Sequence, residues 1–395
     1  MKTLALLALV LIGAQDAPKK RGFLGAQVSE SNGALKIDRI VAGSPAEKAG
    51  FKVGDLIMTV DGVAVTTQAA FVKLIQERGE GATIELQVNR EEKDSREGTA
   101  QKVKITLVAH PQDLLEAPDP SPGMLKVRKF MDLAYGDHER HKLNLVLPET
   151  DKPFPVVMWI HAGAWSFGGR ENETALGMRL AERGIGFAAI SHRLTSGAWM
   201  DPKLPKEGVR HPAHVEDGAR AFAWLHKNIK AKGGDPARLF VSGHSSGGHL
   251  SALLALDPRY LKAHDLPITA IRGAIPVGGG YELTKYHAHL AEGMSKELAD
   301  AHLEYIFGKR EDWVAASPTT YVKDAKVPML VITEDDPGFQ LYKADFEAVV
   351  PKGSPITFWT AADRVHQTIT SMMSRKEPDP PRDKMIEFVR SLCNP

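Results

Sequence analysis

The spacing of apolar residues divides the chain into two parts of different character. Up to about residue 110, short apolar stretches lie between turns, and some alternate apolar with polar residues, as half-buried strands do. Residues 71–77 instead place apolar side chains on one face of a helix. The strands predicted in this part cover residues 35–40, 55–60, 82–89 and 103–108. We therefore expect a small β-rich domain with at least one helix.

Beyond residue 124 the predicted strands are more continuously apolar, and helical patterns lie between them. The strands are predicted at 155–160, 186–191, 239–242, 273–277, 328–333 and 356–360, and helices at 173–183, 216–230 and 248–256. Buried strands that alternate with helices are typical of a mostly parallel sheet covered on both faces. The second part is therefore expected to be an α/β domain, with its active site at the carboxyl ends of the strands.

Two stretches follow neither pattern and indicate boundaries. Residues 1–17 have a basic start, a short apolar run and then small residues, which is typical of a secretory signal peptide; a buried N-terminal strand is the alternative. Residues 111–124 hold four prolines, which disfavour both helix and sheet. The expected organisation is a signal peptide (1–17), a first domain (21–110), a linker (111–124) and a second domain (125–395).

Composition narrows the class of protein. The chain has 395 residues, of which 43% are hydrophobic, and this is enough for two domain cores. The formal net charge is only +1, so neither nucleic acid nor an anionic membrane surface is expected as a partner. The apolar run of the signal is too short to span a bilayer, so no stable membrane insertion is expected after its cleavage. We expect an exported protein, periplasmic or extracellular, whose single cysteine, Cys393, leaves it without an intrachain disulfide.

The most informative motif is Gly243-His244-Ser245-Ser246-Gly247, which follows a predicted strand and precedes a predicted helix. G-x-S-x-G in a strand–turn–helix setting is the nucleophile elbow of α/β-hydrolases. The turn presents the serine at a helix start, where backbone dipoles favour developing negative charge. We therefore expect Ser245 to be the nucleophile and Ser246 to contribute its backbone N–H to an oxyanion hole. His244 is interpreted as a packing residue near the site.

Further motifs suggest the rest of the site. His161-Ala162-Gly163-Ala164-Trp165 resembles the His-Gly-Gly-Gly/Trp oxyanion loop of lipases and esterases, with Ala162 where glycine is usual. The resemblance implies that the N–H groups of Gly163 and Ala164 face the substrate oxygen. His161 is expected to orient this loop.

In α/β-hydrolases the triad follows the chain order serine, acid, histidine, which makes His366 the expected general base. Three carboxylates follow the predicted strand 328–333, at positions 334, 335 and 336. Alignment with the pattern strand-His-Gly-x-x-Asp places the acid at Asp336, with Asp335 as the alternative. Whichever of the two is not catalytic is expected to cap the next helix.

Together these motifs resemble the carboxylesterases related to hormone-sensitive lipase, in particular the bacterial feruloyl-esterase and arylformamidase-like group. The resemblance covers nearly all of residues 125–395. It implies an α/β-hydrolase fold and a small ester substrate. Trp199, Tyr281 and Tyr286 are candidates for an aromatic pocket or for ordinary packing. No metal-ligand or dinucleotide motif is found, so neither metal nor cofactor is expected. A serine peptidase or amidase and a catalytically silent binding protein are the alternatives.

Residues 43–62 carry the pattern GSPAEKAG-x-K-x-GD-x-I-x-x-VDG, in which Ser44 and Pro45 are expected to begin a short helix. The first domain resembles a PDZ domain of the bacterial, protease-associated type. The resemblance implies that the loop Phe23-Leu24-Gly25-Ala26 holds the C-terminal carboxylate of a peptide, which then pairs with the following strand. A domain that serves only as a spacer or docking surface is the alternative.

Overall fold

The structure is a computed structural model that describes residues 21–31, 34–41, 44–90, 99–109, 123–293, 295–362 and 364–393. The predicted signal peptide (1–17) and residues 111–122 of the predicted linker lie outside the described residues. The chain forms two compact units, Met1–Leu114 and Leu115–Pro395, and each is described by itself.

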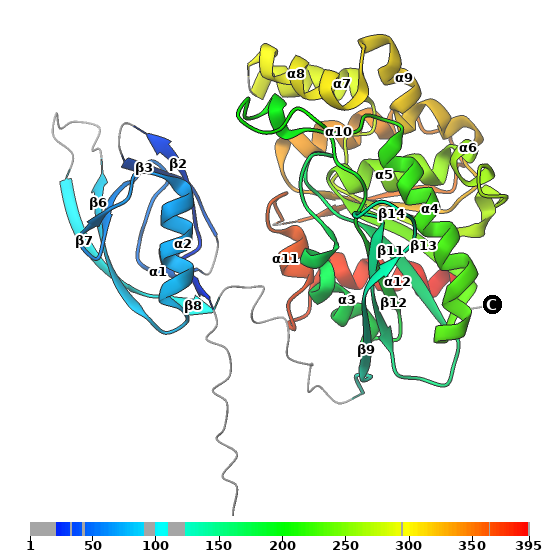
Figure 1. The fold of residues 1–395 in the computed structure, drawn as a ribbon, viewed down its shortest axis with the longest axis horizontal. Coiled ribbons are helices and arrows are strands. Elements are labelled where there is room, and N and C mark those ends of the chain that lie inside the picture. The colour runs from blue at the N-terminus through cyan, green and yellow to red at the C-terminus, as the bar shows by residue number, and fades with distance from the viewer. Residues whose placement is uncertain are drawn as a thin grey trace, which may run out of the picture. The chain divides into compact units, whose positions relative to one another are not determined.

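The first unit is a small antiparallel sheet with two helices (Figure 1). Its strands are β1 (Gly22–Phe23), β2 (Ala26–Ser31), β3 (Ala34–Ile40), β4 (Leu56–Val60), β5 (Val63–Ala64), β6 (Thr83–Arg90), β7 (Thr99–Thr106) and β8 (Val108–Ala109), and its helices are α1 (Pro45–Lys48) and α2 (Gln68–Arg78). The main sheet has the order β2-β3-β4-β6-β7, with β5 beside β4, and β1 pairs with β8 separately. The strands and the helix predicted from the sequence are thus all present.

Two polar residues of the motif at residues 43–62, Ser44 and Asp55, hold the local structure of this unit through their side chains. The Ser44 side chain accepts a hydrogen bond from the Glu47 backbone N–H and so caps α1, as expected. Asp55 is buried and accepts hydrogen bonds from the Arg90 guanidinium and the Lys52 N–H. Burial alone would raise the pKa of this carboxyl, but the Arg90 and Lys52 bonds outweigh it and lower the pKa. Through these hydrogen bonds, Asp55 links the turn before β4 to the last residue of β6, Arg90.

The second unit is built on an eight-stranded sheet of order β16-β15-β14-β13-β11-β12-β10-β9 (Figure 1). Its strands are β9 (Val127–Ala134), β10 (Lys142–Pro148), β11 (Phe154–Ile160), β12 (Gly186–Ile190), β13 (Gly234–His244), β14 (Ile271–Val277), β15 (Met329–Glu334) and β16 (Ile356–Ala361). The strands β11 to β16 are parallel, whereas β10, near one edge, runs antiparallel to both of its neighbours, β12 and β9. The expected mostly parallel sheet, and with it the α/β class, is confirmed.

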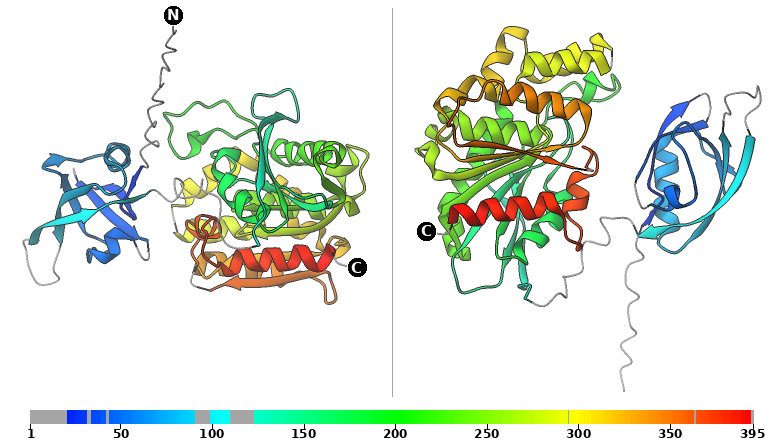
Figure 2. Two further views of the ribbon diagram at one scale, coloured as in Figure 1. Left: turned by 90° about the horizontal axis from the view of Figure 1, so that it is seen from below. Right: turned by 180° about the vertical axis from the view of Figure 1, so that it is seen from behind.

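Helices cover both faces of this sheet, as Figures 1 and 2 show. They are α3 (Thr174–Ala181), α4 (Ala213–Asn228), α5 (Ser246–Leu256), α6 (Pro258–Lys262), α7 (Leu283–Gly293), α8 (Lys296–Phe307), α9 (Trp313–Ala316), α10 (Pro337–Glu347), α11 (Ile369–Met373) and α12 (Pro380–Cys393). The strand β11 shows the reason for two layers. Its alternate side chains Val156 and Met158 join the core under α4 and α5, whereas Val157 and Trp159 join the core under α3, α11 and α12.

No helix within the described ranges combines the length and the apolar character that a membrane span requires.

Candidate active site

The carboxyl ends of four neighbouring parallel strands bring the candidate residues together. β13 ends at His244, β14 at Val277, β15 at Glu334 and β16 at Ala361, and these strands are adjacent in the sheet. Because parallel strands end at the same edge, the residues that follow them converge. Ser245 follows β13, and the loop that carries His366 follows β16.

Ser245 occupies a strained turn between β13 and α5. Its φ of 58° lies in the left-handed region, which side chains other than glycine rarely adopt. A Cβ atom on Gly247 would overlap the carbonyl oxygen of Ile160, so only glycine lets the turn pack against the end of β11. This packing also places the elbow beside the residues that follow Ile160, where the predicted oxyanion loop begins.

A continuous hydrogen-bonded chain joins three side chains from this edge of the sheet. The Ser245 Oγ lies 2.9 Å from His366 Nε2, and His366 Nδ1 lies 3.0 Å from Glu334 Oε1. Glu334 is fully buried, while the His366 side chain is 15% exposed. A hydroxyl donor at one imidazole nitrogen and a carboxylate acceptor at the other is the arrangement that a general base requires.

The prediction that Asp336 orients His366 is wrong, because Glu334 occupies that position. The Asp336 side chain caps α10 instead, with Oδ1 accepting from the Gly338 N–H at 3.2 Å. The alternative, Asp335, is exposed, and its backbone N–H donates to the Arg364 carbonyl. The physical reason is that β15 continues through Glu334, so the first of the three carboxylates already lies at the sheet edge. An ungapped alignment to a family pattern carries no signal for where the strand ends.

Burial and hydrogen bonding set the charge states of this chain. Burial would raise the pKa of Glu334, but the hydrogen bonds from His244 and His366 outweigh it and lower the pKa to about 2. Burial, followed by the proximity of His244, lowers the pKa of His366, although Glu334 opposes this. At neutral pH the carboxylate is therefore charged and the imidazole is neutral, which leaves His366 able to accept a proton.

The loop after β11 forms a tight turn with three successive residues at positive φ. The φ values are 126° at Gly163, 50° at Ala164 and 57° at Trp165. The Gly163 carbonyl accepts the N–H groups of Ser166 and Phe167, which closes the turn. At the two non-glycine positions, Ala164 and Trp165, such a φ costs about 1–3 kcal/mol each and persists only where packing holds it. Trp165 supplies that packing, since its buried ring lies against Phe307 and other aromatic rings.

Buried histidines pack beneath this loop. His161 Nδ1 lies 2.8 Å from the Ala162 carbonyl, and its ring stacks on His192 with centroids 4.4 Å apart. His192 in turn meets the edge of His214, which is also buried. Burial lowers the pKa of His192 and of His214 to about 3. These rings are therefore neutral scaffolding at ordinary pH.

The candidate pocket aromatics fall into different environments. Tyr281 is buried against Phe346 and is core packing. The Trp199 indole N–H donates to Ser166 Oγ, and Tyr286 packs edge-to-face on Trp165. Trp199 and Tyr286 thus adjoin the loop that contains Gly163.

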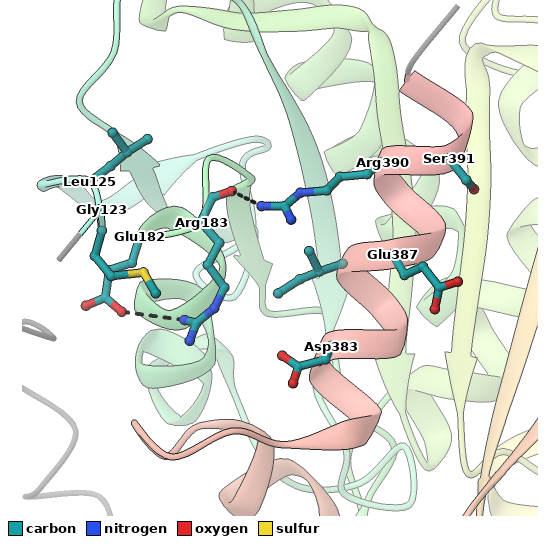
Figure 3. Close-up of a pocket in the computed structure, with 10 residues that line it drawn as sticks. Gly123, Leu125, Glu182, Arg183, Asp383, Glu387, Arg390 and Ser391 are labelled. Carbon is teal, nitrogen blue, oxygen red and sulfur yellow. Dashed lines mark hydrogen bonds and ion pairs between the residues drawn. The ribbon is translucent and has the colours of Figure 1, made fainter. Parts of the chain in front are cut away.

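A surface hollow of about 850 Å³ lies elsewhere, between the segments around Leu125 and Arg183 and the helix α12 (Figure 3). In it, Arg390 donates to the Arg183 carbonyl. None of its lining residues belongs to the Ser245 site.

His244, Glu334 and His366 are also a group, within the described part of the chain, whose ligand atoms are close enough to hold a cation. Glu334 Oε1 already accepts from both imidazoles, and both His366 nitrogens are engaged. We therefore interpret the group as a network that holds and moves protons.

In the first unit, the loop predicted to bind a carboxylate is built as a tight turn. The carbonyls of Leu24 and Gly25 accept the N–H groups of Ala46 and Val41, and Gly25 has a φ of 82°. Phe23 ends β1 and Ala26 begins β2. β2 is the terminal strand of the sheet that the described residues form, so one of its edges has no strand partner there.

The curated relatives are esterases. The chain is 32% identical over 234 residues to "Esterase LipQ" of Mycobacterium tuberculosis, covering 55% of this chain and 51% of that protein. It is 32% identical over 200 residues to "Isoprenylcysteine alpha-carbonyl methylesterase ICME" of Arabidopsis thaliana, covering 49% of this chain and 44% of that protein. The chain thus spans about half the length of the curated relatives it matches.

Solved structures show the same fold. Esterase B of Lactobacillus rhamnosis superposes with a TM-score of 0.55 at 18% identity, covering 70% of this chain and 87% of that one. An esterase of Pyrobaculum calidifontis superposes with a TM-score of 0.52 at 19% identity, covering 71% and 88%. At such low identity these likenesses establish the fold alone, and they confirm the α/β-hydrolase prediction.

Two family models match the chain in succession. The PDZ domain model matches residues 22–106, which confirms the resemblance found in the first unit. The model of the family BD-FAE matches residues 143–341, half of the chain. Its match includes the elbow at Ser245, the Gly163 loop and Glu334, whereas His366 lies beyond it. The chain therefore belongs to the BD-FAE family of α/β-hydrolases and carries a PDZ domain ahead of its hydrolase unit.

Proposed function

We propose that this protein is a serine hydrolase that cleaves carboxylic esters, with Ser245 as nucleophile, His366 as general base and Glu334 as the triad acid. The observation that carries the proposal is the hydrogen-bonded chain from Ser245 Oγ through both nitrogens of His366 to buried Glu334. Its setting in a nucleophile elbow, in a family whose curated relatives are esterases, supports ester chemistry.

In the first half-reaction, Ser245 Oγ attacks the acyl carbon while His366 Nε2 takes the hydroxyl proton. The carbonyl oxygen becomes an oxyanion, which the N–H groups of Gly163, Ala164 and Ser246 are proposed to stabilise. Removing one such donor typically costs about 3–4 kcal/mol of transition-state stabilisation. The imidazolium forms beside the Glu334 carboxylate, which stabilises its charge.

Collapse of the tetrahedral intermediate breaks the bond to the alcohol, and His366 returns its proton to that leaving group. Water then enters, His366 removes one of its protons, and the hydroxide adds to the acyl carbon. Breakdown of this second intermediate releases the carboxylic acid and gives the proton back to Ser245. Glu334 holds the same imidazole tautomer throughout.

The substrate is proposed to be an acyl ester of modest size, such as an aromatic or acetyl ester. Five of the curated relatives are named as methylesterases, which agrees with a small group on one side of the ester bond. Trp199 and Tyr286, which adjoin the proposed oxyanion loop, are the aromatic side chains best placed to contact such a group.

The experiment compares the full chain with Ser245→Ala. Hydrolysis of short p-nitrophenyl esters, methyl ferulate and a peptide anilide is measured, and modification of Ser245 by a fluorophosphonate is located by mass spectrometry. We expect ester turnover and labelling in the wild type and neither in Ser245→Ala, with thermal unfolding as the control for folding. Equal ester turnover by both proteins would refute the role of Ser245. Preferential cleavage of the anilide would instead identify a peptidase or amidase.

The PDZ domain is proposed to bind the C-terminus of a peptide. The open edge of β2 supports this, because an extended peptide can add to it as a further strand. The N–H groups of the Phe23–Ala26 loop are proposed to hold the terminal carboxylate. Peptides selected for binding should lose affinity when that carboxylate is amidated. Unchanged affinity would favour a spacer or docking role.

Export is proposed from the sequence of residues 1–17. Fractionation of cells that express the full chain, followed by N-terminal sequencing, tests it. We expect the exported form to begin shortly after residue 14, and retention of Met1 in a cytosolic protein would refute it.

A further inference from the structure

Glu334 has a second imidazole partner that the proposed mechanism does not use. His244 Nε2 lies 3.2 Å from Glu334 Oε1, the same oxygen that lies 3.0 Å from His366 Nδ1. The His244 side chain is buried, and Glu334 is completely so. Burial of a carboxylate is costly unless its oxygens are hydrogen-bonded, so a second donor at this oxygen has a direct energetic role.

The position of His244 follows from the elbow itself. It is the last residue of β13 and directly precedes Ser245, so the turn that presents the nucleophile also fixes His244. Glu334 ends β15, and β14 lies between these two strands. His244 can reach Glu334 because the residue after β14 is Gly278, where a Cβ atom would overlap the Glu334 carboxylate.

His244 also packs against the base. The ring centroids of His244 and His366 are 4.4 Å apart at an interplanar angle of 39°. On the His366 ring, Phe339 stacks with centroids 3.7 Å apart and an angle of 13°. The base is thus held by two rings and by the carboxylate that His244 also binds.

We propose that His244 is a positioning residue that fixes the Glu334 carboxylate for His366 through its Nε2–H, and that it must stay uncharged while His366 carries the proton from Ser245. The proposal rests on the proposed function, in which His366 is the base. His244 touches no reacting atom and acts only through Glu334 and His366.

The charges around His244 and His366 explain why His244 must stay uncharged. The charged or titratable groups that face this pair are Glu334 on β15, Asp336 at the start of α10 and, toward Glu334, Tyr281. When His366 accepts the Ser245 proton, one cation lies beside one buried anion. A proton on His244 would add a second cation against the His366 ring, which opposes the transfer. His244 already contributes to lowering the pKa of His366.

Two substitutions separate the hydrogen bond from the packing. His244→Leu keeps bulk but removes the donor, whereas His244→Gln keeps an N–H donor near Nε2 and cannot titrate. The readout is the rate at which a fluorophosphonate labels Ser245 in the full chain between pH 5 and 9. For His244→Leu we expect a fall of about 10- to 100-fold, the range for one hydrogen bond to a charged group. The acidic limb should move to higher pH, because the pKa of His366 rises when His244 is gone.

His244→Gln should restore the rate to within a few-fold of the wild type. A role in packing alone would change the thermal unfolding of His244→Leu but not the pH at which labelling falls. Unchanged labelling of His244→Leu at every pH, or a Gln variant as slow as the Leu variant, would overturn the proposal.

A second measurement does not depend on activity. In the Ser245→Ala protein, imidazole N–H protons bonded to a carboxylate should give two far-downfield proton resonances, one from His244 and one from His366. In the double variant that also carries His244→Leu, the resonance of His244 should be absent and that of His366 should shift. A single resonance that survives unshifted would refute the inference. If the wild type shows both resonances but no label reaches Ser245, the proposed function fails and the His244–Glu334 bond stands.

Discussion

The substitution Glu334→Gln removes one charge from the site and almost nothing else. The amide has the shape of the carboxylate, and the position is fully buried between two imidazole donors. Its carbonyl oxygen can still accept the N–H groups of both imidazoles, which bond a single oxygen of Glu334, but it carries no charge that would stabilise a positive His366. The two residues that follow provide matched controls, since Asp335→Asn and Asp336→Asn remove the same charge one and two positions away.

The size of the effect follows from the charge state of Glu334. Its pKa of about 2, against an ordinary 4.5, means that the site prefers the charged carboxylate by about 3 kcal/mol. The imidazolium forms 3.0 Å from the same carboxylate, and we expect an interaction of similar size to be lost with the charge. Losing it corresponds to about 10²-fold in rate, and an acid-to-amide change in a serine triad costs up to about 10⁴-fold when the wrong tautomer also results. We expect kcat to fall by about 10²- to 10⁴-fold.

The control at Asp336 should behave differently. Its side chain caps α10, and asparagine caps helices as well as aspartate does, so Asp336→Asn should change stability by less than about 1 kcal/mol. Its charge contributes only a minor rise in the pKa of His366, so kcat should fall by less than tenfold. Asp335 is exposed, and Asp335→Asn should be close to neutral.

The assay is steady-state hydrolysis of p-nitrophenyl acetate at pH 8 by the four proteins, with thermal unfolding to show that each is folded. Labelling of Ser245 by a fluorophosphonate gives the same comparison if turnover is slow. A Glu334→Gln enzyme within tenfold of the wild type, beside an Asp336→Asn enzyme that has lost activity, would refute the assignment of the acid.

Three further outcomes follow from the same geometry. Gly278→Ala should inactivate the enzyme, because the added Cβ overlaps the Glu334 carboxylate; a normal rate would contradict this. Phe339→Leu should slow Ser245 labelling by about two- to fivefold, because the cation–π interaction between the Phe339 ring and the His366 imidazolium is lost. A faster rate would contradict this prediction. Thermal stability should fall as the pH drops below 6.5, because burial holds several histidines at a pKa of about 3 or 4 in the folded state alone, and the unfolded chain therefore binds more protons. These histidines are His192, His211, His214, His249 and His302. Each lowers the free energy of unfolding by about 2 kcal/mol at pH 5. Calorimetry that finds the same unfolding midpoint at pH 7 and pH 5 would contradict this prediction.

Local patterns alone predicted the six parallel strands and three of the helices of the second unit. Strand β11 was predicted at 155–160 and runs over Phe154–Ile160, and α5 was predicted at 248–256 and runs over Ser246–Leu256. For the predicted elements, the differences lie at their ends. The strand β13 begins at Gly234, five residues before the predicted start, because its first residues are polar and give no apolar pattern although they pair with β11. The strands β9 and β10 and the helices from α6 onward were not among the predicted elements; β9 escapes the apolar pattern because most of its side chains are exposed or only partly buried.

The sequence by itself determined the features that depend on neighbouring residues: the elbow around Ser245, the glycines that the turn requires, and the turn and cap of the PDZ motif. Only the tertiary structure decided which carboxylate meets His366 and what His244 does. Three acids in a row are equivalent in sequence, and the end of β15 and the missing side chain at Gly278 select Glu334 among them. His244 looked like a packing residue because its partner lies 90 positions away, on a strand that only the sheet order brings near. Side-chain direction and burial are properties of the assembled sheet, so no local pattern can carry them.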